Sequence, residues 1–148
     1  MSLSDWLKNG WLTQHRTSRE EIADLLGVIE RDLGDCQTAG LSPDWRLTIA
    51  YNAGLQVATT ALAASGYRAS REAQHYRAIQ SLAFTLQVDA AGLIQLEAFR
   101  KKRNVSDYER AGAVSQVEAD EMVALAQRLR DVLVRWLEEK HPGLLPAE

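Results

Sequence analysis

Apolar side chains recur every three or four residues along most of the chain, which is the spacing of one face of an α-helix. The clearest stripe begins after Ser115-Gln116-Val117-Glu118, a sequence typical of a helix capping box, and ends before His141-Pro142-Gly143, which stops a helix. Its members are Met122, Val123, Ala126, Leu129, Leu133, Trp136 and Leu137. This pattern predicts a long C-terminal helix with one buried face.

Two further helices are predicted in the first half of the chain. Ser18 and Glu21 have capping-box spacing, so each side chain is expected to bond the other's backbone N–H at the start of a helix that ends near Gly34. Ser42-Pro43 marks the start of a second helix, which continues to about Gly66. Small residues that recur along this second helix would let a neighbour approach closely: Ala50, Gly54, Ala58 and Ala61.

The same reasoning predicts two more helices and a short N-terminal turn. Ser70 is expected to cap a third helix and Asp89 a fourth, while Trp6 and Trp11 mark the turn that docks on the side. No stretch alternates apolar and polar residues in the manner of a strand. Because short links favour antiparallel neighbours, we expect an all-α, up-and-down antiparallel bundle with four to five long helices. We expect residues 1–148 to form one domain with its core at about 17–140.

Composition narrows the classes of function. The chain has 148 residues and a formal net charge of −3, so its overall field does not attract nucleic acid. Phosphate binding therefore depends on a local basic cluster. The single cysteine, Cys36, forms no internal disulfide, and no Cys/His group has zinc spacing, so we expect no metal and no cofactor.

No membrane segment or leader is expected. The longest uncharged run covers residues 47–67, but threonine, asparagine, glutamine and serine interrupt it, which favours a buried helix. The N-terminal residues lack the basic start and long apolar core of a signal peptide. These features predict a cytoplasmic protein.

One basic cluster stands out in this acidic chain, the run Arg100-Lys101-Lys102-Arg103. On a helix these four cations fan around most of the circumference, but Arg103 aligns with Asp107, and Asn104 aligns with Tyr108. Arg103 also falls on the apolar side of the helix. Two interpretations remain open: Arg103 pairs with Asp107 while the other cations are solvated, or the cluster binds phosphate.

The segment Phe99–Glu109, the segment Leu41–Gly54 and the helix order are similar to those of HEPN-domain proteins, over about residues 17–140. This resemblance implies a helical bundle that is often a homodimer, and a metal-independent ribonuclease in many members. Numerous members are toxins paired with a nucleotidyltransferase antitoxin. The family motif has an arginine, a polar residue and, several positions later, a histidine.

On this chain the motif arginine falls on Arg103, the polar residue on Asn104, and the histidine is replaced by Tyr108. The resemblance makes these three the candidate catalytic residues, with Arg100, Lys101, Lys102 and Asp107 as local support for nucleic-acid or phosphate binding. A phenol with a pKa near 10 is a poor base at neutral pH. Tyr108 therefore binds phosphate or nucleotide, is a modification target, or closes the helix against the core.

Two functions from different classes follow. The first is a HEPN-like homodimer that engages RNA or a nucleotide through Arg103, Asn104 and Tyr108, within a toxin-antitoxin or defence module. The second is an interaction bundle that binds a nucleotidyltransferase or another partner without a nucleic-acid role. His75 is a weaker candidate, because a lone helical histidine more often packs or lies on the surface than binds a ligand.

Overall fold

The computed structural model describes residues 1–108 and 112–146, with side chains described outside residues 105–111. The elements in chain order are α1 (Leu3–Lys8), β1 (Leu12–Gln14), α2 (Arg19–Asp35), α3 (Pro43–Ala64), β2 (Tyr67–Ala69), α4 (Gln74–Thr85), α5 (Ala90–Tyr108), α6 (Gln116–Lys140) and the 3₁₀ turn η1 (Pro142–Leu144). The expected all-α bundle is confirmed.

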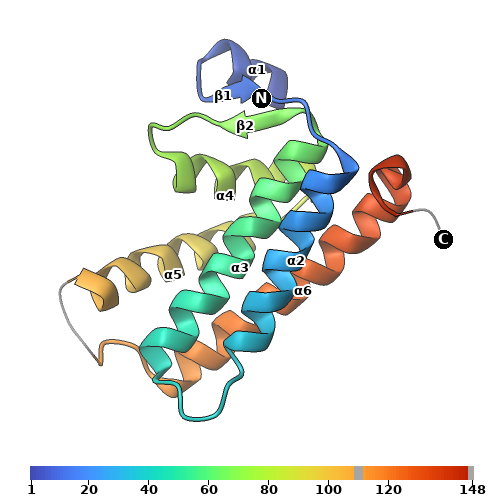
Figure 1. The fold of residues 1–148 in the computed structure, drawn as a ribbon. Coiled ribbons are helices and arrows are strands. Elements are labelled where there is room, and N and C mark those ends of the chain that lie inside the picture. Colours follow the sequence, from blue (N-terminus) through green and yellow to red (C-terminus); the bar gives the residue numbers. More distant parts are fainter. Residues whose placement is uncertain (109–111, 147–148) are drawn as a thin grey trace.

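Helix α3 is the centre of the bundle and contacts each of the other long helices (Figure 1). Helices α2 and α6 lie along one side of it, and α4 and α5 lie on the other side, where they lean away from its axis. The directions are mixed. Helix α2 is antiparallel to α3, whereas α6 runs the same way as α3, since Arg46 near the start of α3 pairs with Asp120 near the start of α6 at 2.7 Å.

The predicted helix starts are mostly found. Ser42 and Ser115 cap α3 and α6 through their hydroxyl oxygens, and the Ser115 box is complete. The Asp89 carboxylate accepts the N–H of Gly92 at 2.9 Å at the start of α5. Each cap satisfies one of the N–H groups that a helix leaves without a partner in its first turn.

At two helix starts the observed cap differs from the predicted one. Ser70 does not cap α4; its hydroxyl donates to the carbonyl of Gly10 at 2.8 Å, and α4 begins instead after Ala73, whose φ of 53° is left-handed. At Ser18 only half of the box forms. The Ser18 hydroxyl accepts the Glu21 N–H, but the Glu21 carboxylate accepts bonds from His15 and Thr17. In both cases another hydrogen-bond partner takes the side chain.

A small two-stranded sheet was not predicted. Strands β1 and β2 pair antiparallel, with Leu12 opposite Ala69 and Gln14 opposite Tyr67. At three residues each, they are too short to show a period of two in the sequence. The ribbon attaches α1 to the end of the bundle where α3 finishes (Figure 1), and Trp6 of α1 is buried there as expected for a docked turn.

Gly54 lies where α3 meets α5 and α6. A Cβ atom built there would sit 3.6 Å from the Met122 methyl and 3.9 Å from a Leu96 methyl, which are ordinary van der Waals distances. The small residues of α3 do face its neighbours, and Ala50, Ala58 and Ala61 are fully buried. The close approach predicted for this helix face therefore occurs, although it would also admit alanine at Gly54.

A buried polar link joins α2 to α3. Asp32 is only 5% exposed, and its Oδ2 accepts a hydrogen bond from the side-chain amide of Asn52 at 2.6 Å. Its Oδ1 accepts two bonds from the exposed guanidinium of Arg31. A carboxylate is stable at this depth because hydrogen bonds replace the water it has lost. Over the described part of the chain, no helix combines the length and the apolar character needed to cross a membrane.

Candidate functional site

The cations of the Arg100–Arg103 run separate on α5, as their angular spread predicts. The Arg100 guanidinium pairs with Glu97, one turn earlier, at 2.6 Å, and Lys102 pairs with Glu118 of α6 at 3.4 Å. Lys101 is exposed. The run is therefore not one basic face, and carboxylates oppose the charges of Arg100 and Lys102.

Arg103 is the member that turns inward. Its guanidinium carbon lies 5.5 Å from the ring centroid of Tyr51, and its side chain is half-buried. Leu96 and Phe99 on the same side of α5 are buried in the core, as predicted. A guanidinium over an aromatic face is held in place by cation–π attraction, so α3 fixes the position of Arg103 from below.

The Tyr51 ring lies beneath the Arg103 guanidinium. The residue is 1% exposed, and its hydroxyl has no hydrogen-bond partner among the described residues. Burial raises the pKa of Tyr51 to about 12, although the charges of Arg100 and Arg103 act in the opposite direction. The phenol therefore stays protonated at neutral pH and can donate a hydrogen bond to an anion if the site opens.

His75 is on the first turn of α4, and the charges of the same two arginines act on its imidazole. Partial burial lowers the pKa of the imidazole, and the positive charges of Arg103 and Arg100 lower it further. The ring is consequently neutral at pH 7. Sequence reasoning did not link His75 to the basic run, because no helical spacing joins residues on two helices; only the packing of α4 beside α5 does so.

The remaining motif residues are described only in part. Asn104 is half-buried on α5 next to Arg103. The backbone of Asp107 and Tyr108 continues the helix, but their side chains lie outside the described residues. The predicted Arg103–Asp107 pair and the predicted trio of Arg103, Asn104 and Tyr108 therefore stay predictions.

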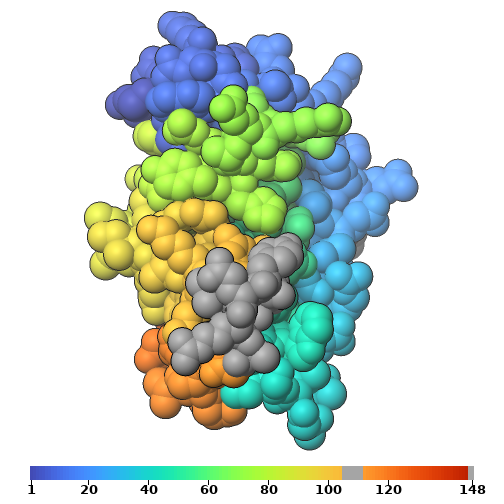
Figure 2. All heavy atoms as spheres, turned by 90° about the vertical axis from the view of Figure 1, so that its left-hand side faces the viewer, coloured from blue at the N-terminus to red at the C-terminus, as the bar shows by residue number. Residues whose placement is uncertain are grey.

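Helices α4 and α5 form adjoining parts of one face of the molecule, below the N-terminal segment (Figure 2). The cluster on this face contains two guanidinium groups, a neutral imidazole and a protonated phenol: Arg100, Arg103, His75 and Tyr51. Positive and hydrogen-bonding groups of this kind suit an oxyanion. Among the described residues, no three His, Cys, Asp or Glu side chains are grouped as a metal site would need.

The molecule is thus an all-α bundle with an arginine-rich cluster on the face formed by α4 and α5. No protein-family model, no curated protein and no solved structure matches the chain.

Proposed function

We propose that this chain is a HEPN-like protein that binds RNA or a nucleotide through a phosphate group at Arg103. The observation that carries the proposal is the position of Arg103, half-buried over the ring of Tyr51 with Arg100 and His75 close by. A guanidinium held in one place loses little conformational freedom when it takes a phosphate in a bidentate pair. Asn104 and Tyr108 would add hydrogen bonds from the following turn.

The charges around Arg103 favour an anion there. Partial burial lowers the pKa of His75, and the positive charges of Arg103 and Arg100 lower it further, as expected where the local potential is positive. A bound phosphate would cancel part of that potential and raise the pKa of His75. The Glu97 carboxylate neutralises Arg100 in part, which lessens the attraction of Arg100 for a phosphate.

Replacing Arg103 with glutamine tests the proposal. We expect a short single-stranded RNA to bind the Arg103→Gln protein about tenfold more weakly at low salt, because one charge-assisted phosphate contact is lost. The slope of log affinity against log salt should fall by about 0.7 in magnitude, the value for one phosphate of a single strand. Fluorescence anisotropy over a range of salt concentrations measures both.

The matched control is Arg135→Gln, which removes an exposed arginine of α6. Equal RNA affinity of wild type and both variants, or negligible RNA binding by all three proteins, would contradict the proposal. Circular dichroism shows whether Arg103→Gln remains folded.

The same variant tests the catalytic form of the proposal, a metal-independent ribonuclease. The observation in its favour is that the charge of Arg103 reaches His75 on α4 and lowers the pKa of its imidazole, because a neutral imidazole is the usual general base at pH 7. Cleavage of RNA in EDTA that disappears in Arg103→Gln and persists in Arg135→Gln would support an enzyme. A folded protein that binds RNA and cleaves none would limit the function to binding.

The proposal includes a homodimer, and a nucleotidyltransferase as the partner that the family resemblance implies. An open groove between α4 and α5 contains Ile94, which is 70% exposed, and Tyr76, which is 40% exposed, beside Lys101. Apolar side chains at such exposure are typical of an interface. Light scattering coupled to gel filtration should give the mass of two chains, and Ile94→Asp should give one; a wild-type monomer at high concentration contradicts the dimer.

A further inference from the structure

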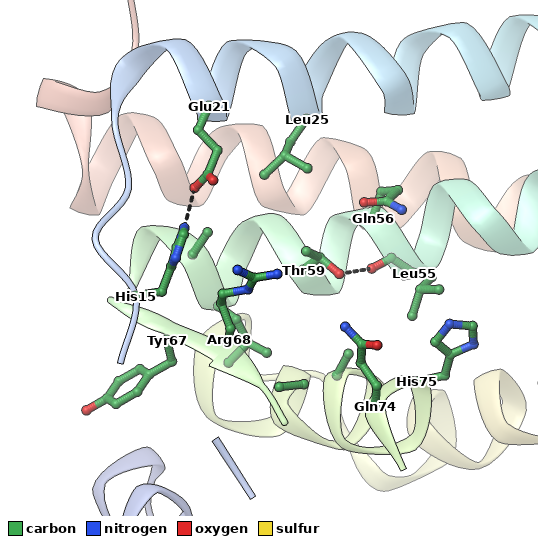
Figure 3. Close-up of a pocket in the computed structure, with 14 residues that line it drawn as sticks. His15, Glu21, Leu25, Leu55, Gln56, Thr59, Tyr67, Arg68, Gln74 and His75 are labelled. Carbon is green, nitrogen blue, oxygen red and sulfur yellow. Dashed lines mark hydrogen bonds and ion pairs between the residues drawn. The ribbon is translucent and has the colours of Figure 1, made fainter. Parts of the chain in front are cut away.

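A second site is lined in part by His75. A pocket of about 310 Å³ opens between α2, α3, β2 and α4, with α2 above it and α4 below it in Figure 3. This volume is at the lower end of the range for small-molecule sites, so it suits a single small ligand. Its lining combines aliphatic side chains with polar groups that come from all four elements.

Glu21 supplies the acceptor in this pocket. Its Oε1 accepts bonds from Nε2 of His15 and from the hydroxyl of Thr17, each at 2.7 Å. Its Oε2 has no hydrogen-bond donor among the described residues. The bonds from Thr17 and His15 lower the pKa of Glu21, so the carboxylate is charged at neutral pH. One oxygen is therefore held in place while the other remains available.

Arg68 supplies the donors. The residue is exposed on β2, and its guanidinium extends over the pocket toward Thr59 (Figure 3). It makes no hydrogen bond or ion pair with another described residue, although its charge contributes to the lowered pKa of Glu21. The amide of Gln74 rises from α4 on the same wall. The pocket thus presents one carboxylate oxygen and one guanidinium that make no hydrogen bond to a described residue.

We infer that this pocket binds a guanine base. Guanine presents two acceptors, O6 and N7, which match the forked donors of an arginine. It also presents two neighbouring donors, N1–H and N2–H, one of which the available Oε2 of Glu21 would accept. Adenine and cytosine have an acceptor at the ring position where guanine has N1–H, and would face the Glu21 carboxylate with a lone pair. The aliphatic side chains of Leu25 and Leu55 offer the apolar contacts that a flat ring needs.

The base site stands apart from the proposed phosphate site. Arg100 and Arg103 do not line the pocket, whereas His75 lines it and the charges of both arginines act on its imidazole. Guanosine, which has no phosphate, is therefore the probe for the pocket alone. A guanosine phosphate would engage both sites only if the proposed function also holds.

Nucleoside titrations followed by ¹H–¹⁵N NMR test the inference. We expect guanosine to bind at least about tenfold more tightly than adenosine, cytidine or uridine, because one good bidentate pair discriminates to that degree. Glu21→Gln and Arg68→Gln should each weaken guanosine binding about tenfold. The matched controls, Glu20→Gln and Arg71→Gln, alter exposed neighbours of the same type and should leave it unchanged.

Equal affinity for the four nucleosides, or guanosine affinity that survives both Glu21→Gln and Arg68→Gln, overturns the inference. Arg68 is exposed, so its variant reports on binding even if Glu21→Gln disturbs the start of α2. The outcomes also separate the two proposals. Guanosine binding without RNA binding contradicts only the phosphate site, and RNA binding that depends on Arg103 without selective guanosine binding contradicts only the guanine pocket.

Discussion

Replacing Tyr51 with alanine is expected to lower the free energy of unfolding by about 3–5 kcal/mol, the usual loss when a buried aromatic ring is truncated. The ring is 1% exposed at the centre of α3, the helix that contacts every other long helix. Its removal would leave a cavity under Arg103 as well. Urea unfolding followed by circular dichroism measures the change.

Tyr51→Phe is the matched control and should be as stable as wild type or about 1 kcal/mol more stable. It keeps the ring beneath Arg103 and removes a buried hydroxyl that has no partner among the described residues. A loss of stability comparable to that of Tyr51→Ala would contradict this account, since it would mean that the hydroxyl and not the ring supports the fold.

The two proteins should also differ at alkaline pH. Burial raises the pKa of Tyr51 in the folded state to about 12, above its ordinary value of 10. Between these two pH values the folded state therefore binds more protons than the unfolded state. The contribution of the Tyr51 hydroxyl to stability is complete below pH 10 and is lost as the pH rises toward 12. The free energy of unfolding of Tyr51→Phe should therefore fall less than that of wild type over this pH range.

Asn52→Ala is expected to lower the free energy of unfolding by about 2 kcal/mol, although alanine favours a helix more than asparagine does. The amide donates to Oδ2 of the buried Asp32 at 2.6 Å, and without it one oxygen of the carboxylate loses its donor. Gln56→Ala is the matched control. It removes a half-buried amide from the next turn of α3 whose side chain makes no hydrogen bond to a described residue.

A double-mutant cycle with Asp32→Ala isolates the link. If the hydrogen bond between Asp32 and Asn52 stabilises the α2–α3 contact, the double variant will lose less than the sum of the two single losses. Strict additivity would contradict the assignment. Arg31 does not confound the cycle, because its exposed guanidinium can return to water when Asp32 is removed.

Local signals predicted the helices well. The apolar period and the cap residues Ser42, Asp89 and Ser115 were sufficient to place α3, α5 and α6, because a helix forms its hydrogen bonds within a few residues of sequence. The same locality explains the wrong prediction at Ser70. Its hydroxyl bonds Gly10, far away in the sequence, and no local pattern contains that partner.

In the candidate sites, too, some features follow from local sequence and others depend on tertiary contacts. The sequence by itself determined that α5 carries a basic run and that Arg103 lies on its apolar side, because both follow from composition and helical period. The tertiary structure alone decided that Tyr51 lies under Arg103, that the charge of Arg103 acts on His75, and that Glu21 bonds His15 instead of completing its cap. These contacts join residues on different elements, and their distances depend on how helices pack, which no period along one helix specifies.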